Sequence, residues 1–500
     1  MKILSATQIY EADSSTIDKQ AISSSELMER AAAACFNWIS QQFPDRSRAI
    51  HVYCGMGNNG GDGLVISRML LESGFKVHVY LINFSEKRSE DFTLNLRRLK
   101  KQNTNVKDIS SENDFTEISE RDLVIDCIFG IGLKRSPAGF TKQIIDRING
   151  SGAEIVSIDI PSGLFSEAPV TDRSAVIRAD FTLTFQVPKL AFFLPDNEIY
   201  TGKWTLIDIG LDEEYIRKAD SKYCYADIVL QRKFFKKRSK FSHKGTFGHS
   251  LLIGGSFGKI GAISLASKAA LKAGSGLVTA YVPKCGYSVL QTAVPEAMVE
   301  VDDEHYLQYF NFKTTPTSIG IGPGLGMHLK TKKGFVDFFS NCKLPLVIDA
   351  DGLNIIAEYK DLSDLIPVDT ILTPHPKEFE RLAGKWKNDF EKLQLLDEYS
   401  ARHKCVVVLK GAHTAISYQG KVWFNSSGNP ALATAGSGDV LTGIITSLLS
   451  QGYSCLEASI LGVYIHGRAA DIAVSRNESQ ESLIASDLSE HLGKVFKELY

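Results

Sequence analysis

Two glycine-rich motifs, one in each half of this 500-residue chain, constrain its fold more than any other feature. Residues 55–63 read Gly-Met-Gly-Asn-Asn-Gly-Gly-Asp-Gly, and residues 436–443 read Gly-Ser-Gly-Asp-Val-Leu-Thr-Gly. Each motif follows an extended or loop-like segment and opens a helix-like stretch. Free backbone N–H groups and the positive end of a helix dipole meet at such a place, which therefore binds phosphate well. The two motifs predict two anion-binding sites in two separate domains.

Short apolar runs alternate with helical patterns in both halves, as in parallel sheets that are covered by helices on both faces. The predicted strands of the first half are residues 50–54, 76–82, 123–127 and 155–160, with helices at 62–73 and 141–149. Those of the second half are residues 250–253, 276–282, 318–321, 346–349, 370–372 and 406–409, with a helix at 262–273. We therefore predict an α/β protein of two doubly wound domains in tandem, which meet near residue 225. The basic run at residues 232–238 is expected to be a solvated connector.

The charge and the cysteines of the chain exclude several classes of protein. A net charge of −2 argues against a general nucleic-acid binder. No apolar run reaches about 18 residues, so we expect no membrane span. The 8 cysteines form no CxxC pair, and several lie in apolar runs. We expect them to be reduced and buried, in a cytoplasmic protein without a zinc site.

Polar and charged side chains of the first half cluster at the ends of predicted strands. The glycine motif at residues 55–63 follows one strand, Asp126 and Asp159 end two others, and Lys189 follows a fourth. Ligands of open α/β sheets bind beyond the carboxyl ends of the strands, where the first three of these segments meet. The glycine spacing does not match the ordinary NAD fingerprint. Asp62 could instead be a helix N-cap, and Asp126 and Asp159 could be turn residues.

These motifs together resemble the NAD(P)H-hydrate epimerase family over about residues 1–215. The shared patterns are GxGNNGGDG at residues 55–63, DxIFGxGLxR at 126–135, DxPSGL at 159–164 and the helical Leu-Met-Glu-Arg-Ala at 27–31. Members of this family invert C6 of the hydrated, damaged nicotinamide cofactor. One departure is visible at residues 165–167, where Phe-Ser-Glu replaces the longer acidic, glycine-containing rim that is usual in the family.

The resemblance implies roles for individual residues of the first half. The catalytic carboxylate at the nicotinamide ring would be Asp159. A potassium ion would be bound by Asn59, Asp126 and Ser162. The hydrate itself would be held by Asn58, Asn59, Gly60, Gly61, Asp62, Gly130, Ile131, Gly132, Leu133, Lys134, Arg135, Ser136 and Asp159.

In the second half, the most informative residue is Asp439, inside the C-terminal glycine motif. The N–H groups at this helix start can stabilise a transferring phosphoryl group, while Asp439 takes the proton from an attacking hydroxyl. Blander interpretations stay open: a helix N-cap after a flexible turn, a loop stiffened by prolines at His375, and a packed histidine at His466. Asp349 and Asp351 are either turn residues or groups close to magnesium.

Five motifs of this half together resemble the NAD(P)H-hydrate dehydratase family, within the ribokinase-like superfamily, over about residues 235–500. They are HKGxxG at residues 243–248, IGPGLG at 321–326, DADxLN at 349–354, LTPHPxE at 372–378 and NPxxAxxGxGDVLTG at 429–443. Members phosphorylate the C6 hydroxyl of the S-hydrate, phosphate then leaves, and NADH or NADPH is restored. Fused members typically use ADP rather than ATP, with magnesium, and release AMP and phosphate. The implied hydrate contacts are Ala262, Gly324, His375 and Asp439, and the implied nucleotide contacts are Lys410, Gly411, Ala412, His413, Thr414 and Gly438.

We therefore expect a Rossmann-like epimerase domain over residues 1–225 and a ribokinase-like dehydratase domain over residues 226–500. Spontaneous hydration gives both C6 epimers and the dehydratase acts on one, so an epimerase on the same chain feeds it the other. The ligands would be NAD(P)H-hydrate and ADP, and we expect a homo-oligomer. The alternative is a hydroxymethylpyrimidine-type kinase of the same superfamily, with a non-catalytic N-terminal binding module.

Overall fold

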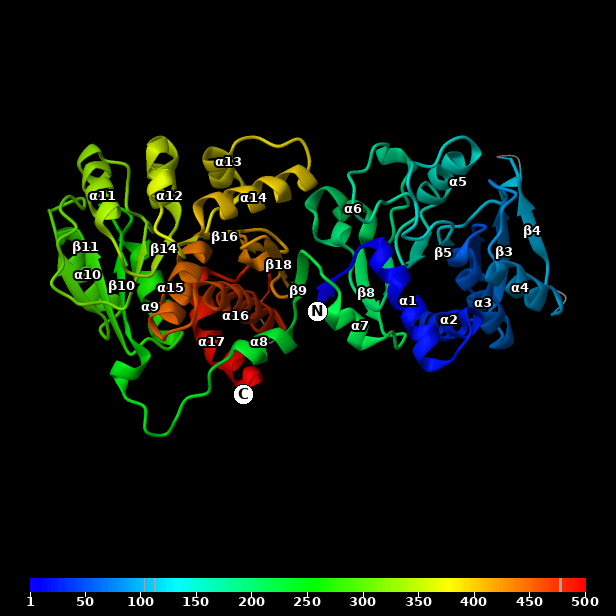
Figure 1. Cartoon of the computed structure of the whole chain (residues 1–500), viewed down its shortest axis with the longest axis horizontal. Coiled ribbons are helices and arrows are strands. Elements are labelled where there is room, and N and C mark those ends of the chain that lie inside the picture. Colours follow the sequence, from blue (N-terminus) through cyan, green and yellow to red (C-terminus); the bar gives the residue numbers. More distant parts are fainter. Residues whose placement is uncertain (103, 112–113, 476–478) are drawn as a thin grey trace. The chain divides into compact units, whose positions relative to one another are not determined.

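The computed structural model of the chain describes residues 1–102, 104–111, 114–475 and 479–500 (Figure 1). It divides into two compact units. One comprises Lys2–Ser221 with Asn388–Phe390, and the other comprises Met1, Lys222–Lys387 and Glu391–Tyr500. The main boundary lies between Ser221 and Lys222, whereas the sequence predicted it near residue 225. Within the described residues, no helix is both long and apolar enough to cross a membrane.

A parallel sheet forms the centre of the N-terminal unit, with the strand order β4-β3-β2-β5-β6-β7-β8. The strands are β2 (Ala49–Cys54), β3 (Lys76–Ile82), β4 (Val106–Ile109), β5 (Leu123–Cys127), β6 (Glu154–Ile158), β7 (Phe181–Phe185) and β8 (Lys203–Ile207), after the short β1 (Lys2–Ile3). The helices are α1 (Ala6–Gln20), α2 (Ser24–Gln42), α3 (Asn58–Glu72), α4 (Glu90–Lys100), α5 (Phe140–Asn149), α6 (Glu198–Thr201) and α7 (Glu213–Lys218). The order reverses between β2 and β5, and such a switch point leaves a crevice at the carboxyl ends of the strands.

The two faces of this sheet carry separate apolar cores. Val52 and Ile125 point to one face, where they pack with residues of α2 and α3. Their neighbours Tyr53 and Val124 point to the other face and pack with residues of α5. Since successive side chains of a strand alternate between faces, this division is that of a doubly wound sheet with helices on both sides.

The C-terminal unit holds a larger, mixed sheet with the order β9-β18-β17-β16-β15-β14-β13-β10-β11-β12. Its pairs are parallel, except that β17 runs antiparallel to both β16 and β18. The strands are β9 (Tyr223–Ala226), β10 (His249–Ile253), β11 (Leu277–Val282), β12 (Met298–Val301), β13 (Ser318–Ile321), β14 (Leu346–Ile348), β15 (Ile371–Leu372), β16 (Val406–Leu409), β17 (Ala415–Tyr418) and β18 (Lys421–Asn425).

Two helices of this unit, α9 (Ile260–Lys272) and α15 (Ser437–Ser450), pack with their backbones in close contact. A Cβ atom on Gly443 would lie 2.1 Å from the carbonyl oxygen of Ala266. The close approach therefore requires glycine at this position. The remaining helices are α8 (Ile228–Phe234), α10 (Tyr287–Ala293), α11 (Leu329–Asn341), α12 (Ala350–Glu358), α13 (Pro376–Ala383), α14 (Asp389–His403), α16 (Cys455–Ser475) and α17 (Ala485–Leu499).

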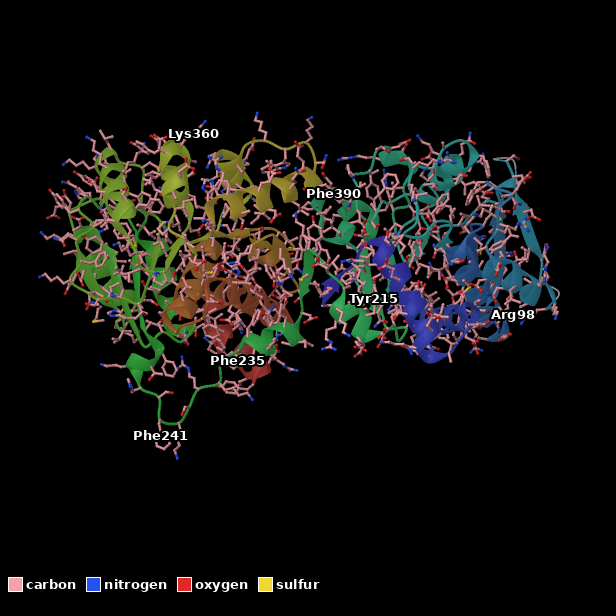
Figure 2. The ribbon with its side chains drawn as sticks, in the orientation of Figure 1. Arg98, Tyr215, Phe235, Phe241, Lys360 and Phe390 are labelled. Atoms are coloured by element: carbon pink, nitrogen blue, oxygen red, sulfur yellow. The ribbon has the colours of Figure 1, made fainter. Side chains whose placement is uncertain are left out.

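The cations of the basic run at residues 232–238 are exposed, as expected of a solvated segment, and two of them also contact the C-terminal unit. The guanidinium of Arg238 lies 3.8 Å from the centre of the Phe247 ring and donates to the carbonyl of Gly274 at 2.6 Å. Lys236 donates to the carbonyl of Gly452 at 2.7 Å. These cations are held against the C-terminal unit because backbone carbonyls and aromatic rings satisfy them. Figure 2 shows Phe241 at the tip of the loop that follows, with its ring in solvent.

All 8 cysteines carry free thiols, but they are not all buried as predicted. Cys224, Cys285 and Cys342 are half-buried, while the other five are buried. Burial raises the pKa of the Cys54 and Cys127 thiols, which therefore act as small apolar groups in the core.

Candidate active sites

The first candidate site lies at the switch point between β2 and β5, where α3 begins. The helix starts at Asn58, after Gly57 as the N-cap, four residues earlier than the predicted start at Asp62. The second part of the glycine motif is therefore helical and not a loop. Its glycines serve close packing, because a Cβ atom on Gly60 would lie 1.9 Å from the carbonyl oxygen of Gly55. Among the described residues no side chain caps this helix, so its first N–H groups are available to a ligand.

Asp126, at the end of β5, is fully buried and holds the neighbouring loops together. Its carboxylate accepts hydrogen bonds from the hydroxyls of Ser157 and Ser162 and from the backbone N–H of Ser162. Burial raises its pKa, and these hydrogen bonds oppose the rise. Asn59 donates to the carbonyl of Phe129 at 2.9 Å, while its buried Oδ1 has no partner within the part of the chain that the structure describes. An unsatisfied buried oxygen is a candidate cation ligand.

Asp159 follows β6 with a positive φ of 67°, in the left-handed region that non-glycine residues rarely adopt. Its carboxylate forms an ion pair of 2.8 Å with Lys189, whose side chain is 1% exposed. The Lys189 ammonium also donates to the carbonyls of Phe185 and Val187. Unusual backbone geometry that is held in place by a buried ion pair is typical of functional sites, since the surroundings must over-determine it.

Asp159 shares a cavity of about 140 Å³ with Asp13, Asp62 and Tyr10. Burial raises the pKa of Asp13 to about 6, and the charge of Asp159 adds to the rise. Burial, followed by the charges of Asp159 and Asp13, raises the pKa of Asp62 well above its usual range. The three carboxylates of this cavity outnumber the Lys189 ammonium that pairs with one of them, so the cavity has a surplus of negative charge when all are ionised.

Tyr10 and Asp13 were not among the predicted site residues. Both lie on α1, far in sequence from every motif, and Ile17 lines the same cavity. Their spacing of three and four residues places them on one face of a helix. The sequence did show polar residues on the same helix face as the apolar Ile17, which is a sign of a buried polar site. The pattern does not show, however, which part of the protein that face contacts.

A larger cavity of about 1120 Å³ adjoins the small one, and Tyr10, Asn58, Asn59 and Gly130 line both. Of the predicted hydrate contacts, Ile131 and Asp62 face the small cavity. Gly60 and Gly61 are absent from the described linings of both cavities, because they pack against the protein. The predicted contacts that line the large cavity alone are Gly132, Leu133, Lys134, Arg135 and Ser136.

The second candidate site gathers the ends of β14 and β16 and the start of α15. Asp349, 2% exposed, forms an ion pair of 2.8 Å with Lys410 and accepts a hydrogen bond of 2.8 Å from Thr442. A Cβ atom on Gly438 would lie 3.4 Å from the Lys410 ammonium, so the glycine turn is next to this cation. Asp349 therefore holds the Lys410 ammonium close to the place where an anion would bind at the start of α15.

Asp439, in the first turn of α15, has a pKa raised to about 7. Burial is the main cause and the charges of Asp349 and Asp351 add to it, while Lys410 opposes the rise. A carboxylate with a pKa near neutrality is suited to general base catalysis. At the same helix end, His466 lies 3.1 Å from the Ser437 hydroxyl, and burial lowers its pKa to about 4. It is thus a neutral, packed histidine, as one interpretation of the sequence held.

His375 is the N-cap of α13. Its Nδ1 accepts hydrogen bonds from the N–H groups of Lys377 and Glu378, and its own N–H donates to the Glu378 carboxylate at 2.8 Å. Burial and then the charge of Lys410 lower its pKa. The ring is therefore neutral, carries its proton on Nε2 and is held firmly by the helix start.

Gly324 and Ala262, two predicted hydrate contacts, lie close together. Gly324 has a φ of 61°, and a Cβ atom on it would lie 3.2 Å from the Cβ of Ala262. The Gly324 carbonyl accepts a hydrogen bond of 2.9 Å from Ser256, in the loop after β10. Asp351 accepts a hydrogen bond of 2.8 Å from Gly326 at the end of the same turn.

The predicted nucleotide segment at residues 410–414 forms the turn between β16 and β17. Gly411 donates its N–H to the Thr414 hydroxyl, which donates to the Gly411 carbonyl at 3.1 Å. His413 lies with Nδ1 3.3 Å from the carbonyl oxygen of Asn425, and burial lowers its pKa. Thr414 and His413 thus stabilise the turn, and Lys410 is the charged group that it brings to the site.

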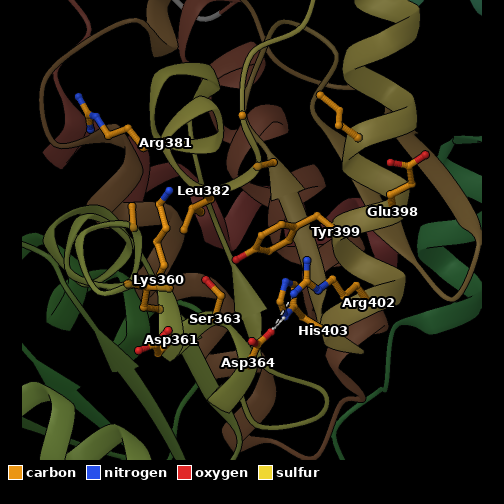
Figure 3. Close-up of a pocket in the computed structure, with 15 residues that line it drawn as sticks. Lys360, Asp361, Ser363, Asp364, Arg381, Leu382, Glu398, Tyr399, Arg402 and His403 are labelled. Carbon is orange, nitrogen blue, oxygen red and sulfur yellow. Dashed lines mark hydrogen bonds and ion pairs between the residues drawn. The ribbon is translucent and has the colours of Figure 1, made fainter.

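A third pocket, of about 550 Å³, lies between α12, α13 and α14 (Figure 3). Its cations Lys360, Arg381 and Arg402 are balanced by carboxylates, and Asp364 pairs with Arg402 at 3.2 Å. The described lining of this pocket contains none of the predicted catalytic residues. A pocket with balanced charge, away from the glycine motifs, is a weaker candidate for the chemistry than the other two sites.

Comparison with known proteins assigns a family to each half of the chain. A family model described as NAD(P)H-hydrate dehydratase matches residues 250–494, and one described as YjeF-related protein N-terminus matches residues 24–191. The bifunctional NAD(P)H-hydrate repair enzyme Nnr of Moorella thermoacetica is 34% identical over 100% of this chain and 97% of its own length. The enzyme of the same name from Escherichia coli is 33% identical over 94% of this chain and 89% of its own.

A solved structure, the ADP/ATP-dependent NAD(P)H-hydrate dehydratase from Bacillus subtilis co-crystallized with ATP/Mg2+, is 30% identical. It covers 55% of this chain and 99% of its own, with a TM-score of 0.48. The similarity to the Moorella enzyme covers the whole chain, and with it both glycine motifs and both candidate sites. On that similarity, the chain belongs to the family of bifunctional NAD(P)H-hydrate repair enzymes.

Proposed function

We propose that this chain repairs hydrated NADH and NADPH in two steps, each at its own site. The N-terminal site exchanges the R and S epimers at C6, and the C-terminal site dehydrates the S epimer with a nucleotide. The observation that carries this proposal is that each half presents a catalytic-type carboxylate at the carboxyl edge of its sheet, Asp159 in one and Asp439 in the other. A small-molecule kinase would have no use for the first of these.

For the epimerisation, the ring nitrogen of the hydrate expels the C6 hydroxyl and a planar iminium forms. Water returns to either face of the ring. The proton taken up by the leaving hydroxide would come from the Lys189–Asp159 pair, through the Asp159 carboxyl, and the returning water would give it back to the pair. The negative charge of Asp159, and that of Asp13 when it is ionised, would stabilise the cationic iminium.

A potassium ion fits the oxygen atoms beside this cavity. The unpartnered Oδ1 of Asn59, the Asp126 carboxylate and the Ser162 hydroxyl would hold it, since hard cations prefer oxygen ligands. Its charge would offset part of the negative charge near the hydrate's phosphates. The loop at residues 128–130 would then be fixed where the ligand binds.

For the dehydration, Asp439 would take the proton of the C6 hydroxyl, whose oxygen attacks the terminal phosphorus of the nucleotide. The N–H groups at the start of α15 and the Lys410 ammonium would stabilise the transferring phosphoryl group. The ring nitrogen then expels phosphate from C6, and loss of a proton from C5 restores NADH or NADPH.

ADP is proposed as the donor, with AMP and phosphate as products, because fused members of the family typically use it. Magnesium would accompany the nucleotide phosphates, close to Asp349 and Asp351. Free thiols throughout the chain support a cytoplasmic location. A homo-oligomer is also part of the proposal. Sedimentation equilibrium measures the mass of the assembly.

The test is recovery of the reduced cofactor from a mixture of R and S NADH-hydrate, with magnesium, potassium and either ADP or ATP. We expect full conversion, faster than the epimers exchange spontaneously, and faster with ADP than with ATP. Conversion that stops at the S fraction would contradict the epimerase. No conversion with either nucleotide would contradict the dehydratase and favour the small-molecule kinase.

A further inference from the structure

The large cavity of the N-terminal unit is lined by four cations, and its described lining contains no carboxylate. Lys134 and Arg135 belong to the motif after β5, whereas Lys87 and Arg88 lie in the segment between β3 and α4. All other lining residues are neutral. A concave surface with four unbalanced cations attracts a ligand with several negative charges.

The order of the strands shows how a long ligand can lie across this edge of the sheet. The neighbouring strands β6, β5, β2 and β3 are followed by Asp159, the glycine loop at 130–132, the start of α3, and the segment at 84–88. Three strand spacings separate the first from the last, about 14 Å in all. A dinucleotide with its nicotinamide at Asp159 and its pyrophosphate at α3 therefore has its adenosine at the end of β3.

The segment after β3 is held in position by the backbone. Phe84 donates its N–H to the carbonyl of Ile82 at 3.0 Å, and Ser89 donates its N–H to the carbonyl of Met56 at 3.1 Å, next to the start of α3. Phe84 and Phe129 both line the cavity, with their ring centroids 4.8 Å apart, and the Phe84 side chain is 38% exposed. An exposed aromatic ring at this place can stack on an adenine.

We propose that Lys87 and Arg88 form a subsite for a phosphomonoester on the adenosine ribose, so that the epimerase prefers NADPH-hydrate to NADH-hydrate. This inference rests on the proposed epimerase function. Lys134 and Arg135 suffice for the pyrophosphate, with about two negative charges, and a 2′-phosphate adds about two more. In dinucleotide-binding α/β folds, an arginine near the end of the strand next to the glycine turn accommodates this phosphate.

The test compares epimer exchange of NADPH-hydrate and NADH-hydrate by the full chain without nucleotide, starting from the pure R epimers and separating the products by chromatography. We expect kcat/KM of the wild type to be about tenfold or more higher on NADPH-hydrate, because charge-assisted hydrogen bonds to the 2′-phosphate are gained. In the double variant Lys87→Ala/Arg88→Ala the ratio should fall to about one. Most of the loss should be on NADPH-hydrate and in KM.

Glu86 supplies a matched control, because it is exposed, adjacent in sequence and outside the described lining of the cavity. Glu86→Gln changes the local charge by one unit and should leave the ratio of the two substrates unchanged within about twofold. Equal kcat/KM on both substrates in the wild type, or a ratio that survives in the double variant, would overturn the proposal.

A second measurement separates this proposal from the proposed function. If the wild type exchanges neither pair of epimers, the epimerase assignment fails, and binding of 2′-phospho-ADP-ribose and ADP-ribose then decides the subsite. Tighter binding of the 2′-phosphorylated probe, lost in Lys87→Ala/Arg88→Ala, supports it. Equal binding of the two probes, or a preference that the double variant retains, overturns it.

Discussion

The N-terminal cavity gathers Asp13, Asp62 and Asp159 around one buried ammonium, whereas the C-terminal site places Asp439 beside the paired Asp349 and Lys410. When its carboxylates are ionised, the first arrangement carries surplus negative charge, which suits a reaction that passes through a cationic ring. The second combines the proposed carboxylate base with a cation and a helix start, an arrangement suited to accepting a proton and holding phosphates at the same time. The difference teaches that charge balance, more than fold, separates the two chemistries of this chain.

The largest expected effect comes from a substitution in the C-terminal site that should leave the N-terminal activity unchanged. Asp439→Ala should lower the rate of dehydration by on the order of 10²-fold or more, since it removes the proposed base, and leave epimerisation intact. Asp439→Asn keeps the shape of the side chain and should lose about as much activity. Dehydration within a few fold of the wild type in both variants would show that the base lies elsewhere.

Asp159→Ala is the reciprocal change, with an expected loss of about 10²-fold in epimer exchange and unchanged dehydration of the pure S epimer. The variant leaves the Lys189 ammonium buried without its carboxylate partner, so its fold should be checked by circular dichroism. Asp159→Asn, which keeps a hydrogen-bond acceptor for Lys189, is the matched control for folding. Loss of both activities in a folded variant would contradict two independent sites.

A smaller effect concerns the stability of the crowded carboxylates. The pKa of Asp13 is raised from 3.8 to about 6 in the folded chain, so its ionisation opposes folding. The penalty grows as the pH rises between these two values and is complete above about 6. Asp13→Asn should therefore raise the free energy of unfolding by roughly 3 kcal/mol at pH 8 and by little at pH 4. Thermal unfolding at both pH values measures the difference, and an equal shift at both would refute the charge explanation.

A further prediction distinguishes the two sites by the pH dependence of dehydration. Because the pKa of Asp439 is about 7 and a base must be ionised, kcat/KM for dehydration should fall about tenfold per pH unit below 7. Above that value it should reach a plateau. Measurement with the pure S epimer and saturating ADP isolates this step from epimerisation. A rate that is flat between pH 5 and 8 would exclude Asp439 as the titrating base.

Much of both sites could be predicted because strand ends are visible in the sequence. Apolar runs that end in Asp126, Asp159 or Asp349 place those carboxylates at the same edge of a sheet, and the fold class and family are confirmed. The start of α3 was misplaced because glycines lower helix propensity, whereas here they permit close packing. The local pattern does not show this, since the packing partners come from another strand.

The residues that were missed reach the sites through tertiary structure. Asp13 lies on a helix that precedes the whole N-terminal sheet, and Lys87 and Arg88 follow a strand that carries no recognisable motif. The antiparallel strand β17 was also not predicted, because its short apolar run has no helix before it to indicate a crossover. Which segments meet at a sheet edge depends on strand order, and one sequence does not give that order.

The contact between Gly443 and Ala266 has a mechanical consequence for the dehydratase half. It joins α15, which carries the proposed phosphoryl-binding turn, to α9, which carries Ala262, without a compressible side chain between the two backbones. The two helices are therefore expected to move as one rigid unit. Any opening or closing of the site around its substrates would then be a motion of the surrounding loops. Gly443→Ala would force the two helices apart. It would thereby increase the distance between the proposed nucleotide site at α15 and the proposed hydrate site at α9, although no reacting group would have been changed.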